Sequence, residues 1–291
     1  MSTEWSRRSV LGLIGAGGAG LLSSVAFAQS SGDVLARIRK AGIVKVGLVS
    51  AGAYGALKPD GSVDGLAPVI VKLVMERLGV AKVEGIVASY GELIPGLQAG
   101  RWDIIGAALA VTKARCDQVA YSDPFGDDYA AFTYLPSELP NPPKSIKELG
   151  ERNIKVGISA GAYGVNIVRA AYKDQSNVSV FPDSPTILEA VANKRVQMGS
   201  VGVLLAKQML AQKPGSFAFI GPMSGDLIVP MSAAFRTGDK DLIDAFQAEF
   251  RKMKQTGEWE KIVTNFGFEV FPGTKEKNPQ QACEQVSVAE G

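Results

Sequence analysis

Short apolar runs alternate with amphipathic segments along this chain, and this alternation restricts the folds that it can adopt. Runs typical of β-strands lie at 43–49, 83–87 and 103–108, and segments with helical spacing of apolar residues, 68–78 and 93–99, separate them. Strands that alternate with helices favour a largely parallel sheet covered on both faces. The sequence therefore predicts an α/β fold with mixed, mostly parallel sheets flanked by helices.

The same pattern begins again after a proline-rich break at 136–143 and a weak helical segment at 145–149. The strand-like runs of this second unit are 154–158, 178–181 and 196–201. Within it, Ser184 stands where a helix N-cap is expected, and Pro185 follows at the first helical position. Farther on, a segment that opens at Asp239 places its apolar residues along one stripe, which predicts a helix packed on the core.

The N-terminus has the layout of a secretory signal. Residues 6–11 form a twin-arginine motif, an apolar stretch follows at 12–27, and Ala26-Phe27-Ala28 supplies a small-x-small cleavage site. Paired arginines at this place indicate the Tat export route, cleavage after Ala28 and a periplasmic mature chain. The alternative is an uncleaved membrane anchor, although the apolar stretch is shorter than the ~20 residues that a spanning helix prefers.

A glycine-rich segment inside this signal matches a nucleotide-binding fingerprint. Residues 15–20 read Gly-Ala-Gly-Gly-Ala-Gly, which fits GxGxxG letter for letter. The fingerprint binds a dinucleotide only between a strand and a helix, with an acidic residue about twenty positions later. Because this segment precedes the predicted mature chain, we discard the match.

The composition excludes several classes of function. The chain has no histidine, which excludes Ser-His-Asp and Cys-His nucleophile systems and the usual imidazole metal sites. Its 31 basic and 29 acidic residues nearly balance and form no basic stripe, so we expect no nucleic-acid partner. No apolar run of membrane length follows the signal, and the mature chain is expected to be soluble. We expect neither a metal nor an organic cofactor.

Two cysteines, Cys116 and Cys283, are present. They are too few for a structural zinc site, and in an oxidising compartment two cysteines most simply pair in a disulfide. The alternative is two reduced, buried cysteines, and the sequence leaves both arrangements open.

Several motifs that occur in order along the chain resemble one protein family. They are Leu-Ile-Pro-Gly-Leu-Gln-Ala-Gly-Arg-Trp-Asp-Ile-Ile at 93–105, Thr-Lys-Ala-Arg at 112–115, Val-Ala-Tyr-Ser-Asp-Pro-Phe at 119–125, Phe-Arg-Thr-Gly-Asp at 235–239 and Asn-Phe-Gly-Phe at 265–268. Together they resemble the family 3 solute-binding proteins of ABC importers, which bind polar amino acids and related compounds. The resemblance covers essentially the whole mature chain. Within the family, Tyr90-Gly91 and Arg115-Cys116 are most similar to the ectoine and hydroxyectoine binders.

The resemblance implies a discontinuous, two-lobed fold of the periplasmic-binding-protein type (type II). The expected parts are 1–28 for the signal, 34–129 and 231–280 for lobe one, 130–230 for lobe two, and 281–291 for a C-terminal tail. Two crossing strands, near 128–133 and 228–231, would be the hinge about which the lobes close on a ligand. The implied function is the capture of a small carboxylated zwitterion, an ectoine-like compound or amino-acid derivative. A monomer without enzyme activity would deliver it to the membrane permease of an ABC importer.

The resemblance also implies which residues bind the ligand carboxylate. Arg115 ends the Thr-x-x-Arg motif, where the arginine of the family grips that carboxylate, and a planar guanidinium suits bidentate pairing. The alternative role for Arg115 is to neutralise a helix end or Asp117. Thr112 lies on the same loop, and its hydroxyl or backbone N–H is expected to reach the same carboxylate.

Aromatic and small residues complete the expected site. Tyr54 and Tyr90 occupy positions that contact the ligand in the family, where aromatic faces attract a delocalised cation. Gly161, Ala162 and Tyr163 match the turn that opens the second helix of lobe two. The N–H groups of such a turn suit a carboxylate, and Tyr163 is also a candidate lid. The alternatives are ordinary core or cleft-wall packing for Tyr54 and Tyr90 and a plain tight turn at 161–163.

Two departures from the family limit the choice of ligand. The aspartate that pairs with the α-ammonium in amino-acid binders falls on Gly202 here, so an ordinary free amino acid should bind poorly unless another carboxylate substitutes. The candidate substitutes are Asp128, Glu92 and Asp183. The third cage aromatic of ectoine binders falls near Ala110, and the serines frequent at 108 and 110 are alanines. We therefore expect a pocket that is roomier or less polar than in either subgroup.

Two other functions stay open at this point. A periplasmic lyase that resembles cyclohexadienyl dehydratase would share the fold and needs a carboxylic acid that protonates a leaving hydroxyl, for which Glu92 and Asp128 are candidates. An acid with a raised pKa in the cleft would favour this alternative. The other is a chemosensory binding protein that docks on a receptor instead of an importer, which the sequence does not separate from transport.

Overall fold

The fold is taken from a computed structural model that describes residues 33–212, 215–268, 273–284 and 287–288. Strands among these residues form an 11-stranded sheet along the path β4-β1-β5-β12-β7-β10-β8-β9, from which β6, β11 and β13 branch, and a separate sheet of β2 and β3. The strands are β1 (Ile43–Leu48), β2 (Ala56–Leu57), β3 (Val63–Asp64), β4 (Lys82–Val87), β5 (Ile104–Ala110), β6 (Ala120–Tyr121), β7 (Gly126–Tyr134), β8 (Val156–Ser159), β9 (Val178–Phe181), β10 (Met198–Gly202), β11 (Ala218–Ile220), β12 (Leu227–Phe235) and β13 (Ser287–Val288). Strand β1 pairs in parallel with β4 and β5, and β8 with β9 and β10, whereas β7 and β12 run antiparallel to their neighbours.

Helices flank both groups of parallel strands. They are α1 (Val34–Ala41), α2 (Leu66–Arg77), α3 (Tyr90–Gln98), α4 (Lys113–Cys116), α5 (Ile146–Glu151), α6 (Val165–Ala170), α7 (Ser184–Ala192), α8 (Val203–Gln212), α9 (Lys240–Gln255), α10 (Glu258–Asn265) and α11 (Pro279–Glu284), with short 3-10 turns at Gly52–Tyr54 and Gln175–Asn177. Helices α2 and α3 pack against β1 and β5, and α7 packs against β8, β9 and β10. This mixed α/β architecture is the predicted fold class.

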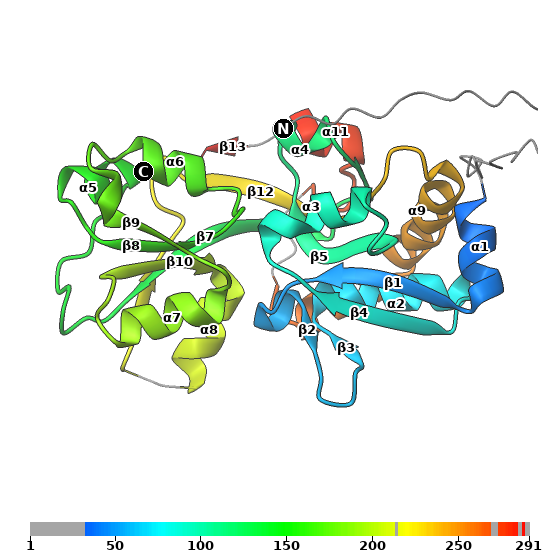
Figure 1. The fold of residues 1–291 in the computed structure, drawn as a ribbon, viewed down its shortest axis with the longest axis horizontal. Helices are drawn as coiled ribbons and strands as arrows, with labels where there is room; N and C mark the ends of the chain where they lie inside the picture. The colour runs from blue at the N-terminus through cyan, green and yellow to red at the C-terminus, as the bar shows by residue number, and fades with distance from the viewer. Residues whose placement is uncertain (1–32, 213–214, 269–272, 285–286, 289–291) are drawn as a thin grey trace, which may run out of the picture. The chain divides into compact units, whose positions relative to one another are not determined.

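Two long strands, β7 and β12, connect the two groups of parallel strands (Figure 1). They pair with each other between residues 126–129 and 228–231. Beyond that stretch β7 continues beside β10 and β11, and β12 continues beside β5 and β6. Each strand therefore belongs to both groups, and the predicted crossing segments 128–133 and 228–231 lie within them.

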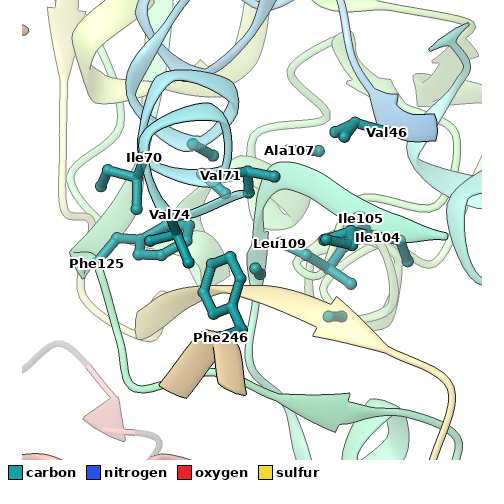
Figure 2. Packing of buried hydrophobic residues seen from close by; sticks show 14 of the residues in the cluster. Val46, Ile70, Val71, Val74, Ile104, Ile105, Ala107, Leu109, Phe125 and Phe246 are labelled. Atoms are coloured by element: carbon teal, nitrogen blue, oxygen red, sulfur yellow. The ribbon is translucent and has the colours of Figure 1, made fainter. Parts of the chain in front are cut away.

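The first group of strands encloses its own hydrophobic core. Helix α2 lays Ile70, Val71 and Val74 against β5, because these apolar residues share one face of the helix. Figure 2 shows them together with Val46, Ile104, Ile105, Ala107, Leu109, Phe125 and Phe246. The helix predicted to open at Asp239 is α9, with Asp239 at its N-cap. Its predicted apolar stripe is buried in this core at Leu242, Phe246, Phe250 and Met253.

The second group of strands packs around a separate core. Phe132 from β7, Val156 from β8 and Met198 from β10 are fully buried in one cluster. Ile187 and Val191 of α7 belong to two smaller clusters beside it. Separate cores joined by two shared strands form the two-lobed arrangement that the resemblance implied.

The predicted cap of α7 is wrong. The helix begins at Ser184, but its N-cap is Asp183, whose backbone is extended and whose Oδ1 accepts from the Thr186 N–H at 2.8 Å. An aspartate at the N-cap satisfies one of the unpaired N–H groups of the first turn. Ser184 therefore moves to the first helical position, where it is buried, and Pro185 stands within the first turn.

Cys116 and Cys283 form a disulfide, with Cα atoms 6.2 Å apart, so the predicted pairing is confirmed. The bridge ties α4 to α11, a helix that lies far along the chain. The residue that precedes Cys116 is Arg115, and the bridge therefore anchors the helix that carries the predicted carboxylate-binding arginine.

Two parts of the chain bear on whether it crosses a membrane, the described helices and the predicted export signal. Among the described helices, none combines the length and the apolar character needed to cross a membrane. The predicted export signal, residues 1–28, lies outside the described residues.

Candidate ligand-binding site

A cavity of about 750 Å³, including the space at its mouth, is lined by residues from both groups of strands. The sequence-predicted residues that line it are Tyr54, Tyr90, Ala110, Arg115, Ala162, Tyr163 and Gly202. Thr112 and Gly161 are not among the lining residues. Lining residues that were not predicted to bind the ligand are Ala51, Ala108, Ala130, Phe132, Ile158, Ser159, Gly164, Val168, Ser184, Ser200, Val201, Leu205, Asp226 and Met231. Asp128, considered there as a substitute carboxylate, also lines the cavity.

Arg115 extends into this cavity from the four-residue helix α4. Its Nη1 donates to the Ala110 carbonyl at 2.8 Å, and its Nη2 donates to the Gly161 carbonyl at 2.8 Å. Burial lowers the pKa of the guanidinium, and the neighbouring tyrosines act in the opposite direction. Because a guanidinium has five N–H donors, several are left for an anionic group of a ligand.

The surroundings of Arg115 hold this side chain without neutralising it. Asp117, the alternative partner, pairs with Lys113 at 2.8 Å instead. In the described part of the chain, Arg115 forms no ion pair with a carboxylate. Thr112 is the N-cap of α4 and accepts at its carbonyl from the Arg115 N–H at 3.0 Å, so it positions the arginine from outside the cavity wall.

Tyr54 is buried and joins the two groups of strands. Its hydroxyl donates to Asp128 Oδ1 at 2.8 Å and accepts from the Leu204 N–H at 3.2 Å. Its ring packs edge-on against Phe268, with ring centroids 5.1 Å apart. Burial raises its pKa well above the ordinary value for tyrosine, and the charge of Asp128 adds to this. Tyr54 is thus a fixed wall of the cavity with its hydroxyl already bonded.

The space beside Gly202 is filled by the ring of Tyr54. A Cβ atom at position 202 would lie 2.6 Å from the hydroxyl oxygen and two ring carbons of Tyr54. Real non-bonded contacts of a Cβ atom are longer than 3.0 Å, so any side chain here would displace the tyrosine. The carboxylate that pairs with the α-ammonium in amino-acid binders therefore has no room at this position.

Two buried aspartates line the cavity, Asp128 on β7 and Asp226 directly before β12. Their exposed fractions are 7% and 2%. Burial raises the pKa of Asp128 to about 7 and that of Asp226 to about 6, although hydrogen bonds to each carboxyl act in the opposite direction. Asp226 Oδ1 accepts from the Leu227 N–H at 2.8 Å, and the Ala130 backbone also lowers the pKa of this carboxyl, whereas Oδ2 forms no hydrogen bond of normal geometry among the described residues.

Two tyrosines complete the polar lining. Tyr90 is the first residue of α3, whose start is fixed because the Ser89 N–H and hydroxyl donate to Glu92 Oε2 at 2.9 and 2.8 Å. The hydroxyl of Tyr163 is buried and has no hydrogen-bond partner within the described ranges. Burial raises the pKa of Tyr163 well above its usual value, and the charges of Asp128 and Asp226 add to the rise.

Two of the candidate substitute carboxylates, Glu92 and Asp183, do not line the cavity. Glu92 is exposed and caps α3, and its hydrogen bonds with Ser89 lower its pKa. Asp183 caps α7 as described above. Both interpretations as cleft acids are wrong because each carboxylate is used at a helix start.

The backbones of Gly91 and Gly161 meet beside the cavity. Gly161 has a φ of +72°, and a Cβ atom on it would lie 2.4 Å from the Cα and N atoms of Gly91. Gly161 therefore contributes the carbonyl that accepts from Arg115 and a close backbone contact with the start of α3, but no cavity surface.

Asp226 is the charged lining residue that was not predicted from the sequence. The signal in the sequence is an acidic residue directly ahead of the apolar run 227–235. That signal gains meaning only once the run is known to cross between the two groups of strands. No group of three or more His, Cys, Asp or Glu side chains that could hold a metal ion occurs among the described residues.

The fold and the cavity define a two-lobed binding protein of the periplasmic-binding-protein type. The chain belongs to the bacterial extracellular solute-binding proteins, family 3, whose family model matches residues 44–269. A probable amino-acid ABC transporter periplasmic-binding protein from Sinorhizobium fredii is 24% identical over 276 residues, which cover 91% of each chain.

Solved structures of binding proteins have folds similar to this one. The structure of EhuB in complex with hydroxyectoine is similar with a TM-score of 0.81 and 31% identity, and the match covers 86% of this chain and 98% of that one. An ancestral amino acid-binding protein described as a precursor of cyclohexadienyl dehydratase has a TM-score of 0.69 at 21% identity, over 80% of this chain and 98% of that one. The second likeness concerns the fold alone.

Proposed function

We propose that this protein is the extracytoplasmic solute-binding component of an ABC importer and captures a small carboxylated zwitterion, an ectoine-like compound or an amino-acid derivative. The observation that carries the proposal is the Arg115 guanidinium, which lines the cavity, bonds two carbonyls and has no carboxylate partner in the described chain. A ligand carboxylate would supply the missing negative charge in bidentate geometry. The similarity to an amino-acid ABC transporter periplasmic-binding protein supports the transport role.

Capture would proceed by closure of the lobes about β7 and β12. The proposed boundaries are 34–129 with 231–280 for lobe one, 130–230 for lobe two and 281–291 for the tail. Apart from the backbone bonds of the crossing strands, two hydrogen bonds among the described residues then run between these lobes, from Arg115 Nη2 to the Gly161 carbonyl and from the Leu204 N–H to the Tyr54 hydroxyl. An open form would break both, so these bonds support a closed state that a ligand stabilises.

The lining of the cavity supports a ligand that carries a delocalised or alkylated cation. Four aromatic side chains contribute to it: Tyr54, Tyr90, Phe132 and Tyr163. Aromatic faces attract such cations by roughly 0.5–2 kcal/mol each. Ala110 offers no ring, so the cage of this protein would draw on Phe132 and Tyr163 instead. EhuB, which is similar over most of the chain, binds hydroxyectoine.

The test is a thermal-shift screen of residues 29–291 against ectoine, hydroxyectoine, the common amino acids and small zwitterions. A ligand at one hundred times its Kd adds about 2.7 kcal/mol of stability and so raises Tm by several degrees. Arg115→Ala should abolish the shift, and Arg195→Ala, a change at an exposed arginine of lobe two, should leave it intact. A shift that survives Arg115→Ala would contradict the role of Arg115, and a screen without any shift would reject the ligand class.

A lyase is the second candidate function, because the cavity contains buried carboxylic acids that are able to protonate a leaving hydroxyl. Asp128 and Asp226 are buried carboxyls whose pKa values burial raises to about 7 and about 6, so either is able to donate a proton near neutral pH. The assay is incubation with a cyclohexadienyl carboxylic acid, followed by ultraviolet absorbance of an aromatic product. Product formation that Asp128→Asn or Asp226→Asn removes would favour the lyase over simple binding.

We also propose export by the Tat route, cleavage after Ala28 and a periplasmic, monomeric mature protein. Replacing Arg7 and Arg8 together by lysine should retain the precursor inside the cell, and N-terminal sequencing of the wild-type periplasmic fraction should begin at Gln29. Light scattering checks the monomer.

A sensing role would be favoured if uptake of the ligand persists without this protein while the response to it is lost.

A further inference from the structure

The charged residues that line the cavity do not balance. They are one arginine, Arg115, and two aspartates, Asp128 and Asp226. The proposed function pairs Arg115 with the ligand, which leaves both aspartates without a cation. Asp128 accepts a hydrogen bond from the Tyr54 hydroxyl. Asp226 is only 2% exposed, and the backbone of Ala130 lies near enough to lower its pKa, but its Oδ2 forms no hydrogen bond of normal geometry among the described residues. Buried carboxylate oxygens in folded proteins are normally paired, so this atom indicates a missing partner.

A second unpaired polar atom belongs to the same cavity. The hydroxyl of Tyr163 is buried without a hydrogen-bond partner in the described ranges, and the charges of Asp128 and Asp226 both act on it. A carboxylate oxygen accepts only, and a phenol oxygen also accepts. A ligand group with several N–H donors and a positive charge would therefore satisfy both atoms at once.

We propose that Asp226 and the Tyr163 hydroxyl bind an N–H-bearing cation of the ligand, an ammonium, amidinium or guanidinium group. This inference rests on the proposed function, which supplies the carboxylate pole at Arg115. The site for the cation thus lies next to the crossing strand β12, because Tyr54 occupies the space at Gly202. The other ionisable groups at this site are Asp128 on β7, Tyr90 at the start of α3 and Tyr163 before α6. Arg115 is the one cationic side chain among the described lining residues.

The first test needs no ligand. Asp226→Asn keeps the Oδ1 that accepts from the Leu227 N–H and removes the charge, and Tyr163→Phe removes the unpaired hydroxyl. Each should raise Tm of the ligand-free protein to the extent that its cavity is closed, because Asp226→Asn removes a buried charge and Tyr163→Phe removes a buried hydroxyl without a partner. The control is Asp123→Asn, a change at a buried aspartate that is paired with Arg251 at 3.0 Å, which should lower Tm. If Asp226→Asn lowers Tm as Asp123→Asn does, Asp226 has a structural partner and the inference is overturned.

The gain in Tm from Asp226→Asn should also depend on pH. A carboxyl whose pKa is about 6 in the folded protein and 3.8 as a free side chain binds more protons in the folded state. The wild type therefore loses stability as pH rises from about 4 to about 6, and Asn removes this loss. The gain should be small at pH 4 and full above pH 7, and a gain independent of pH would contradict an ionised, unpaired Asp226.

The second test compares ligands in pairs by titration calorimetry. L-Arginine is matched with neutral-side-chain L-citrulline, and ectoine with L-pyroglutamate. The wild type should bind the member with the extra cation about tenfold tighter or more, and Asp226→Asn should bring the ratio of the two Kd values close to one. A ratio that Asp226→Asn leaves unchanged would overturn the inference.

The two proposals fail in different ways. Arg115→Ala should weaken both members of a pair equally, and if it weakens neither, the proposed carboxylate pole is wrong while the ratio still measures Asp226. If no member of either pair binds, the proposed ligand class fails, and the ligand-free melting experiment decides the inference about Asp226 and Tyr163.

Discussion

Gly161→Ala should destabilise the closed form of this protein more than it destabilises the fold, so the two effects can be measured apart. The φ of +72° at Gly161 disfavours any L side chain by about 1–2 kcal/mol, and this strain is local to the loop after β8. It therefore weakens open and closed forms alike. The new Cβ atom would also lie 2.4 Å from the Gly91 backbone, where ordinary contacts begin at 3.4 Å. The backbones of the two proposed lobes would have to separate by about 1 Å, and only the closed form is affected.

The two effects have different magnitudes and different readouts. Strain at Gly161 should lower Tm by a few degrees, as a loss of 1–2 kcal/mol does in a protein of this size. Overpacking against a backbone that has no freedom to turn aside costs about 1–3 kcal/mol, which corresponds to a Kd about 5- to 150-fold weaker. The hydrogen bond from Arg115 to the Gly161 carbonyl would lengthen with the same displacement and add to the loss of affinity.

Titration calorimetry with the ligand from the thermal-shift screen measures the effect, and two variants serve as controls. Gly257→Ala introduces the same strain at a φ of +73° where nothing lies within 4 Å, so it should lower Tm and leave Kd unchanged. In Gly91→Ala the new Cβ meets no atom closer than 3.8 Å, so Kd and Tm should both stay near the wild type. If Gly161→Ala binds as tightly as Gly257→Ala, Gly91 and Gly161 do not form a closing surface and the reasoning is refuted.

Three further changes test the surroundings of the cavity. Reducing the Cys116–Cys283 bridge, which spans a sequence separation of 167, should lower the free energy of unfolding by at most about 5 kcal/mol; unchanged guanidinium midpoints with and without dithiothreitol would contradict this. Gly202→Asp should destabilise by about 1–3 kcal/mol because it displaces Tyr54, and new amino-acid binding by this variant would show that the space is free. Tyr54→Phe removes a hydrogen bond that lowers the pKa of Asp128, so that pKa, followed by carboxyl NMR, should rise above about 7; a constant value would mean that Tyr54 does not bond an ionised Asp128.

Most of the longer elements followed from the sequence, although α1, α8 and α10 were not predicted. The predicted strand 178–181 is observed as β9, and the predicted helix at 68–78 is α2 with its start two residues earlier. The two-residue strands β2, β3 and β6 were not predicted, because a pattern needs about four residues before alternation is visible. The N-cap of α7 was misplaced by one residue because Asp183 and Ser184 are both good capping residues, and only the backbone conformation decides between them.

Some residues of the candidate site were predicted from the sequence, and others became apparent only in the structure. Arg115 was found through its motif, and the Cys116–Cys283 pairing through the expected compartment. The sequence showed that position 202 lacks the aspartate of amino-acid binders. It did not show that the ring of Tyr54 fills the space there, because that contact joins residues far apart in the chain. Asp226 was missed because an acidic residue directly ahead of an apolar run does not by itself show that its side chain lines a cavity.

The placement of the charged groups suggests that the two poles of a ligand have different roles. Arg115 belongs to one proposed lobe and bonds the Gly161 carbonyl of the other, so a carboxylate held by Arg115 would act on the surfaces that close. Asp128 and Asp226 lie on or directly before β7 and β12, which belong to both lobes and move least in a hinge rotation. A cation bound there would add affinity whether the lobes are open or closed. On this reasoning the carboxylate drives closure, and the cation selects which carboxylated compound remains bound.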